Sequence, residues 1–254
     1  MERSIQLMKD HINEILSNNK PSIYLFGSVV LDDFQLGWSD IDILCLTGQP
    51  ISEDKAEQLV KLRQTLLEQE PGNQYFRSFE GGMLSLAAFL NQSRERAVYW
   101  GTSGQRITEN YVFDPFSLME LIDSGRLLSG DEIRQHLKRP TYEELKAAVV
   151  HHYEAIRKYA VHTNRTLYSP GWLLDIARCL YTLETGKIIA KTAAGEWALQ
   201  HHLAPNPEVL QRAVDIRKNP LKYKYEEAVL DWTETLGKYV HEFADVLEHQ
   251  IARV

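Results

Sequence analysis

Cysteine, long apolar runs and surplus positive charge are all scarce in this sequence of 254 residues. Its two cysteines, Cys45 and Cys179, lie far apart in apolar surroundings, so we expect buried thiols in a reducing compartment and no disulfide framework. No run of about eighteen apolar residues occurs, which argues against a membrane-spanning helix. The first residues form a charged amphipathic pattern that differs from a signal peptide, so we expect a cytoplasmic protein.

The charge balance is acidic, with 35 Asp and Glu against 28 Lys and Arg and a formal net charge of −7. A chain of this kind lacks the broad basic surface of a nucleic-acid-binding protein. It suits a cationic small-molecule partner better, and we expect no nucleic acid, no membrane and a monomer. The length permits one large domain or two modest ones.

The N-terminal part of the chain mixes two hydrophobic periodicities. They predict helices over residues 2–18 and from Ser52 to Pro71, and strands over 22–26, 40–46 and 83–90. The character changes near Pro140, where Thr141 and Glu144 have the spacing of a capping box. Beyond it the pattern predicts helices near 141–162, 171–185, 191–203, 206–217 and 222–251. We therefore predict an α+β protein with a mixed-sheet domain over residues 1–138 and an all-helical domain over 139–254.

Two carboxylates occupy alternate positions at the start of the second predicted strand. Alternate strand residues share a face, so Asp40 and Asp42 project together, about 7 Å apart. Like charges this close repel each other unless a cation lies between them. Mg²⁺ is bound in this way, through one or two carboxylates together with substrate phosphates. Gly27-Ser28 follows the first strand, where a glycine lets the backbone approach a phosphate and a serine hydroxyl can bind it.

These motifs resemble those of a known family. The stretch FGS…WSDIDIL is similar to the signature of the polymerase-β-like nucleotidyltransferases. The segment from Ser169 to Leu199, SPGWLLDIARCLYTLETGKIIAKTAAGEWAL, resembles the helical domain of the aminoglycoside 3''/9-adenylyltransferases. The resemblance extends over both predicted domains, and it implies a polymerase-β-like fold and an adenylyltransferase that uses ATP and Mg²⁺.

The resemblance also implies roles for single residues. Asp40 and Asp42 would bind Mg²⁺, and Ser28 and Ser39 would contact the triphosphate next to Gly27. Arg178 and Lys191 fall on the family's cationic triphosphate-binding positions. Asp114 lies near a family aspartate that contacts the nucleotide, although the alignment there needs a gap and an aspartate before proline is often part of a turn.

The third carboxylate is where the sequence departs from the family pattern. Glu80 occurs at the distance from Asp42 expected for the catalytic base and third metal ligand, but Gly81-Gly82 follows it. Two interpretations are open. Glu80 is the base, placed just before a strand with a bulge, or it is an exposed loop residue in a protein without a base. We favour Glu80 as the base.

The predicted acceptor site departs from the family too. Tyr159 and Asn164 stand where streptomycin-modifying members carry a tryptophan and an aspartate, which favours spectinomycin as the acceptor; the substrate-binding residues are otherwise not assigned. Arg157 and His162 have the spacing of helical ribonucleases, which arises easily by chance in helices.

The predicted function is transfer of AMP to a hydroxyl of an aminoglycoside or aminocyclitol. The alternatives are a non-catalytic nucleotide-binding module and a toxin–antitoxin transferase, for which the chain is too long.

Overall fold

The computed structural model describes residues 1–101, 104–160 and 162–253, which form two compact units. The first unit comprises Met1–Val30 and Asp40–Arg139, and the second comprises Leu31–Ser39 and Pro140–Val254. The short segment Leu31–Ser39, called here the 31–39 segment, therefore clusters with the second unit, although the sequence places it between two strands of the first.

The first unit is built on a six-stranded sheet with the order β5-β4-β3-β2-β1-β6. β2 and β3 are parallel, whereas every other neighbouring pair is antiparallel, so the predicted mixed sheet is confirmed. The strands are β1 (Ser22–Phe26), β2 (Ile41–Thr47), β3 (Phe79–Ser85), β4 (Ala97–Gly101), β5 (Gly104–Thr108) and β6 (Arg126–Ser129).

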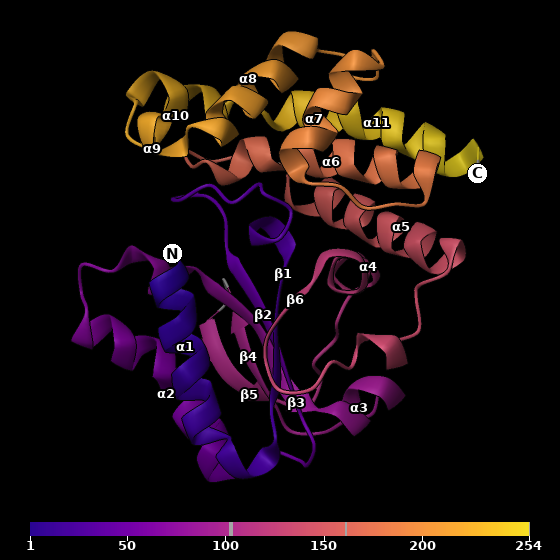
Figure 1. Cartoon of the computed structure of the whole chain (residues 1–254). Helices are drawn as coiled ribbons and strands as arrows, with labels where there is room; N and C mark the ends of the chain where they lie inside the picture. Colours follow the sequence, from indigo (N-terminus) through magenta and orange to yellow (C-terminus); the bar gives the residue numbers. More distant parts are fainter. Residues whose placement is uncertain (102–103, 161, 254) are drawn as a thin grey trace. The chain divides into compact units, whose positions relative to one another are not determined.

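Helices cover both faces of this sheet (Figure 1). On one side lie α1 (Glu2–Ile15) and α2 (Glu53–Gln69), and on the other lie α3 (Leu86–Asn91) and α4 (Pro115–Ser124). β1 is buried along its whole length, and β2 is buried at every position except Asp42. Central strands covered on both faces read as continuous apolar runs, which is why the sequence predicts β1 with its observed bounds.

The third predicted strand is placed wrongly by the sequence pattern. We expected a strand over 83–90, but β3 ends at Ser85 and α3 follows it directly. The Ser85 hydroxyl accepts a hydrogen bond from the Ala88 amide at 3.1 Å and so caps the helix. An N-cap of this kind satisfies an amide that the first turn leaves unpaired, and here it outweighs the strand pattern of the apolar residues after it.

The second unit is helical, as predicted. Its helices are α5 (Tyr142–Tyr159), α6 (Tyr168–Thr185), α7 (Lys191–Gln200), α8 (Pro207–Lys218), α9 (Pro220–Tyr223), α10 (Glu227–Glu234) and α11 (Gly237–Arg253). The capping box of Thr141 and Glu144 is confirmed at the start of α5. Residue 161, within the range expected for that helix, lies outside the described residues.

The single helix expected over 222–251 is wrong, because α9, α10 and α11 occupy this stretch. Hydroxyl groups at the second break bond to nearby backbone. Thr233 Oγ1 donates to Leu230 O at 2.8 Å, and Thr235 Oγ1 donates to Trp232 O at 2.8 Å. Such bonds give the backbone an alternative to continued helix. None of the helices in the described part of the chain is long and apolar enough to span a membrane.

Candidate active site

One edge of the sheet gathers the predicted residues of the first unit. β1 runs antiparallel to β2, and β2 runs parallel to β3, so the end of β1 meets the beginnings of β2 and β3. In this register Phe26 is paired with Asp42, and Asp42 is paired with Glu80. Paired residues on neighbouring strands project from the same face. The structure therefore brings Asp42 and Glu80 together at the position where Gly27 and Ser28 follow β1.

The carboxylate of Asp42 lies directly against Gly27. Gly27 has a φ of +69°, and a Cβ added there would lie 2.1 Å from Asp42 Oδ2. A larger residue would therefore displace the carboxylate, besides adopting an unfavourable backbone conformation. The sequence assigned this glycine to phosphate binding, which stays a prediction. The local requirement for glycine follows from the space that Asp42 occupies.

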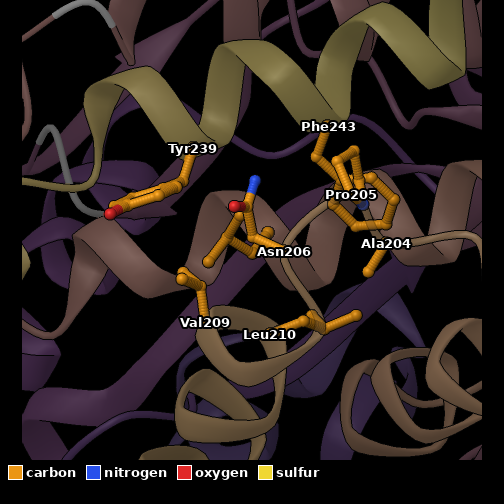
Figure 2. Close-up of a pocket in the computed structure, with 8 residues that line it drawn as sticks. Ala204, Pro205, Asn206, Val209, Leu210, Tyr239 and Phe243 are labelled. Atoms are coloured by element: carbon orange, nitrogen blue, oxygen red, sulfur yellow. The ribbon is translucent and has the colours of Figure 1, made fainter.

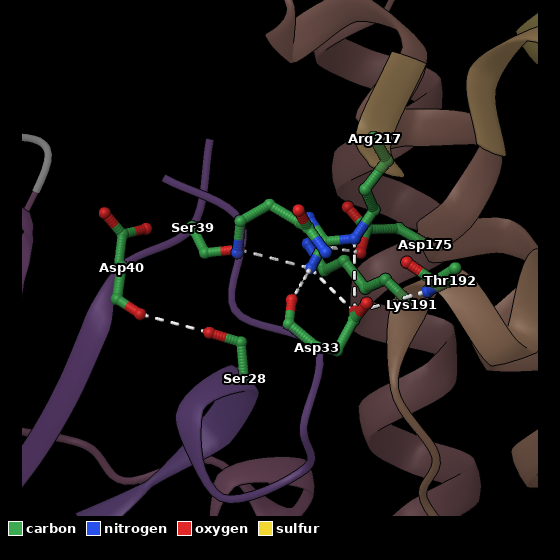
Figure 3. Close-up of polar contacts among 9 residues, drawn as sticks. Ser28, Asp33, Ser39, Asp40, Asp175, Lys191, Thr192 and Arg217 are labelled. Carbon is green, nitrogen blue, oxygen red and sulfur yellow. Dashed lines mark hydrogen bonds and ion pairs between the residues drawn. The ribbon is translucent and has the colours of Figure 1, made fainter. Parts of the chain in front are cut away.

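Ser28 holds the backbone next to the carboxylates. Its hydroxyl donates to the main-chain carbonyl of Asp40 at 3.1 Å (Figure 3). Asp40 itself stands immediately before β2, which begins at Ile41. Because the bond ties the turn after β1 to the residue that enters β2, Ser28 has a positioning role whether or not it also contacts a phosphate.

Glu80 is the second residue of β3, so it lies neither just before the strand, as the sequence interpretation placed it, nor in an exposed loop. The two glycines after it lie inside the strand, and each is required by close packing. A Cβ on Gly81, which has a φ of +143°, would lie 1.8 Å from the Ile43 carbonyl oxygen. A Cβ on Gly82 would lie 2.0 Å from the ring of Tyr111. The glycine pair is thus explained by backbone and ring contacts within the sheet, and Glu80 is a half-buried strand residue beside Asp42.

A cation that the sequence analysis missed lies beside these carboxylates. Arg63, on α2, donates from Nη1 to the main-chain carbonyl of Phe79 at 2.7 Å. Burial lowers the pKa of Arg63, while the charges of Glu80 and Asp40 act in the opposite direction. Its position on an ordinary amphipathic helix carries no signal, because the contact with β3 arises only from the packing of α2 on the sheet.

The donor set at this edge fits a hard divalent cation. Its side-chain donors are carboxylate oxygens, which Mg²⁺ prefers, and Asp42 Oδ2 is held in the space that a side chain at residue 27 would fill. Within the described residues no group of three His, Cys, Asp or Glu side chains is assembled as a complete metal centre. A metal here would take part of its ligands from outside the chain, as Mg²⁺ does when it binds together with substrate phosphates.

Asp114 has a local role that accounts for it. It is the N-cap of α4, and Pro115 follows as the first helical residue. The carboxylate accepts hydrogen bonds from the amides of Phe116 and Ser117 at 2.9 and 3.1 Å, and from the Ser117 hydroxyl at 2.6 Å. These bonds stabilise the helix start, and a nucleotide contact by Asp114 stays a prediction.

In the second unit the two predicted triphosphate-binding cations converge on one aspartate, which the sequence analysis also missed. Lys191 Nζ, at the start of α7, lies 2.8 Å from Asp175 Oδ1 on α6. Burial raises the pKa of Asp175, but the charges of Lys191 and Arg178 more than offset this and keep that pKa below its ordinary value. The spacing of Asp175 and Arg178, one helical turn apart, is the only sequence signal for this cluster.

Ser39 is also held within the second unit. It is buried, and its hydroxyl accepts a hydrogen bond from the Gln35 amide at 3.0 Å and another from Arg217 Nη2 at 3.4 Å. Arg217 belongs to α8 and forms an ion pair with Asp33 (Figure 3). Neither Asp33 nor Arg217 was singled out by the sequence analysis.

Both predicted acceptor positions are exposed. Tyr159 lies at the end of α5, and the side-chain oxygen of Asn164 accepts a hydrogen bond from the Thr166 hydroxyl at 2.6 Å. Arg157 pairs with Asp245 and Glu248 on α11, which explains it as part of a surface network.

A small hollow in the same unit is lined mainly by apolar side chains, among them Leu210, Tyr239 and Phe243 (Figure 2). Its space of about 10 Å³ is roughly enough for one water molecule. The hollow is therefore too small to receive an aminocyclitol.

Family models match both parts of the chain. Residues 137–248 match the family model described as the C-terminal domain of aminoglycoside adenylyltransferase, and residues 8–77 match the model of a nucleotidyltransferase domain. Among solved structures the chain is similar to the spectinomycin adenyltransferase AAD(9) from Enterococcus faecialis, determined with ATP and spectinomycin. The TM-score is 0.65 at 18% identity, with 96% of this chain and 99% of that chain covered, a likeness that shows the fold alone. No curated protein matches the chain.

Proposed function

Because the chain belongs to the aminoglycoside adenylyltransferase family of polymerase-β-like nucleotidyltransferases, we propose that it transfers AMP from ATP to a hydroxyl of an aminocyclitol. The observation that carries this proposal is the register of β1, β2 and β3. It pairs Phe26 with Asp42 and Asp42 with Glu80, so a Gly-Ser turn and the carboxylates meet at one sheet edge.

The chemistry assigns a separate task to each carboxylate. Glu80 accepts the proton of the acceptor hydroxyl, whose oxygen then forms a bond to the α-phosphorus. The bond from that phosphorus to pyrophosphate breaks, and pyrophosphate leaves with the electron pair. Asp40 and Asp42 would hold Mg²⁺, which would neutralise negative charge on the triphosphate. Their positions are maintained by the Ser28 hydroxyl and by the close contact of Asp42 with Gly27.

Cations and hydroxyl groups of the chain bind the triphosphate in this proposal. The triphosphate of ATP carries four negative charges, which one metal ion does not neutralise. In this proposal Arg178 and Lys191 supply the additional positive charge. The remaining nucleotide contacts are assigned to Gly27, Ser28, Ser39 and Asp114.

The acceptor proposed is of the spectinomycin class. Streptomycin carries two guanidinium groups, which favour carboxylate partners. Tyr159 and Asn164 provide none at the two positions where the streptomycin-modifying enzymes carry their aromatic and acidic residues. The AAD(9) structure contains spectinomycin, which is consistent with this choice.

The test is acceptor-dependent release of pyrophosphate from ATP and Mg²⁺, with spectinomycin and streptomycin as rival acceptors and mass spectrometry to detect the adenylylated product. We expect product with spectinomycin. Loss of the general base in Glu80→Gln should lower turnover roughly 10²–10⁴-fold. Glu57→Gln, an exposed position on α2, is the matched control and should retain parent activity. Binding of ATP without transfer to any aminocyclitol would instead favour a nucleotide-binding module.

A further inference from the structure

The 31–39 segment is joined to the helices of the second unit by a buried ion pair. Asp33 Oδ2 lies 2.8 Å from Arg217 Nη2, and the two side chains are only 7% and 4% exposed. Arg217 Nε also donates to Asp33 Oδ2 at 3.2 Å, and Nη2 reaches the Asp33 main-chain carbonyl at 3.3 Å. Burying two charges is costly, so a pair of this kind contributes less to stability than to fixing a particular geometry.

The ion pair contacts Ser39 and the backbone next to Lys191, and both residues are predicted to bind phosphate. On one side Arg217 Nη2 donates to the hydroxyl of Ser39, the last residue of the segment, at 3.4 Å. On the other side the amide of Thr192 donates to Asp33 Oδ2 at 3.3 Å. Thr192 follows Lys191 directly, at the start of α7. Figure 3 shows Arg217 and Thr192 both contacting Asp33, and Arg217 also contacting Ser39.

Lys191 is thus fixed from two directions. Its ammonium group is held by Asp175, while the backbone beside it is held by Asp33. Ser39, in turn, is held by the Gln35 amide and by Arg217. All of these contacts lie within the second unit.

We propose that Asp33, together with Arg217, is a positioning residue that holds Ser39 and Lys191 in one arrangement for binding the triphosphate of ATP. This inference rests on the proposed function, because it assumes that both residues bind phosphate. Asp33 itself does not touch the nucleotide. Because Asp33 positions both residues, the contributions of Ser39 and Lys191 to ATP binding are coupled. Neither contribution is complete once the Asp33 carboxylate is removed.

Coupling between the two contacts is measured by a double-mutant cycle. The affinity for ATP with Mg²⁺ is determined by calorimetry for Ser39→Ala, Lys191→Ala and the double variant, in the parent and in Asp33→Asn. In the parent we expect each single change to weaken binding about tenfold or more, and the double change to weaken it by much less than the product. In Asp33→Asn, binding should already be weakened and Ser39→Ala should cost less than about twofold more.

A control separates positioning from stability. Asp245→Asn removes the carboxylate of an exposed Asp–Arg pair in the same unit and should change neither ATP affinity nor the coupling between Ser39 and Lys191. If Asp33→Asn fails to fold, Arg217→Lys keeps the charge but loses the two-nitrogen contact, and the same loss of coupling is expected. Lower stability with unchanged affinity and unchanged coupling would overturn the proposal.

The outcomes also separate this inference from the proposed function. Coupled ATP binding in a parent that transfers AMP to no aminocyclitol would support Asp33 as a positioning residue and reject the transfer. A parent that does not bind ATP with Mg²⁺ would overturn both.

Discussion

In the first unit the predicted metal ligands are carboxylates in or next to neighbouring strands, whereas in the second the predicted triphosphate-binding cations act on one carboxylate, that of Asp175. Asp42 and Glu80 are register partners, and the charges of Glu80 and Asp40 raise the pKa of Arg63 against the larger effect of burial, which lowers it. In the second unit Lys191 is paired with Asp175. Under the proposed function, the first unit would gain from an added cation, whereas the second would have to exchange or share an internal anion for phosphate.

The largest effect should follow from removing a carboxylate of the first unit. Asp42→Asn should lower transfer at least about 100-fold, since a metal's stabilisation of phosphoryl-transfer charge is worth several kcal/mol. The melting temperature should stay the same or rise, because the change relieves repulsion between like charges. Turnover and thermal unfolding are measured together, with Asp54→Asn on the exposed surface of α2 as the control. Transfer above a tenth of the parent rate would show that Asp42 is not a metal ligand needed for the reaction.

The sequence predicts the features that depend on local pattern. β1, the course of β2 from Ile41 onward and the Thr141–Glu144 capping box are all set by residues a few positions apart. The start of β3 depends on residues far along the chain. The Ile43 carbonyl and the Tyr111 ring leave no room for a larger residue at Gly81 and Gly82. In the sequence alone these partners are not visible, and the two glycines are typical of a turn.

The same reasoning explains the missed pairs of the second unit. Asp33 and Arg217 are 184 positions apart, and neither stands in a motif. A single sequence gives no signal for such a pair, because each residue alone is an ordinary loop aspartate or helix arginine. Asp175 and Lys191 are closer in sequence, but they meet only because α6 and α7 pack together.

A smaller effect should follow from removing the internal anion. Asp175→Asn should lower the free energy of unfolding by about 1–3 kcal/mol at pH 7, since it leaves Lys191 without its charged partner. The pKa of Asp175 is lowered in the folded state, so its contribution is complete above its ordinary value of 3.8 and is lost as the pH falls through the folded value. The stability difference from the parent should therefore vanish on acidification.

Asp175→Asn also tests whether ATP phosphate replaces the Asp175 carboxylate as the partner of Lys191. Because ATP no longer competes with the carboxylate, the rise in melting temperature on adding ATP with Mg²⁺ should be larger in Asp175→Asn than in the parent. Thermal unfolding with and without nucleotide measures it. A smaller rise would mean that Asp175 orients Lys191 for phosphate and does not compete with it.

The smallest effect concerns Thr192, whose amide binds Asp33 while its hydroxyl is buried with no hydrogen-bond partner among the described residues. Valine has the same shape without the polar group. Thr192→Val should thus raise the free energy of unfolding by up to about 1 kcal/mol and leave ATP affinity unchanged, because the contact with Asp33 is made by the backbone. Thr182→Val is the matched control. The Thr182 hydroxyl hydrogen-bonds with the carbonyls of Arg178 and Lys187, so its loss should be destabilising by about 1 kcal/mol. Chemical denaturation of both variants measures the difference, and equal destabilisation would show that the Thr192 hydroxyl has a partner in solution.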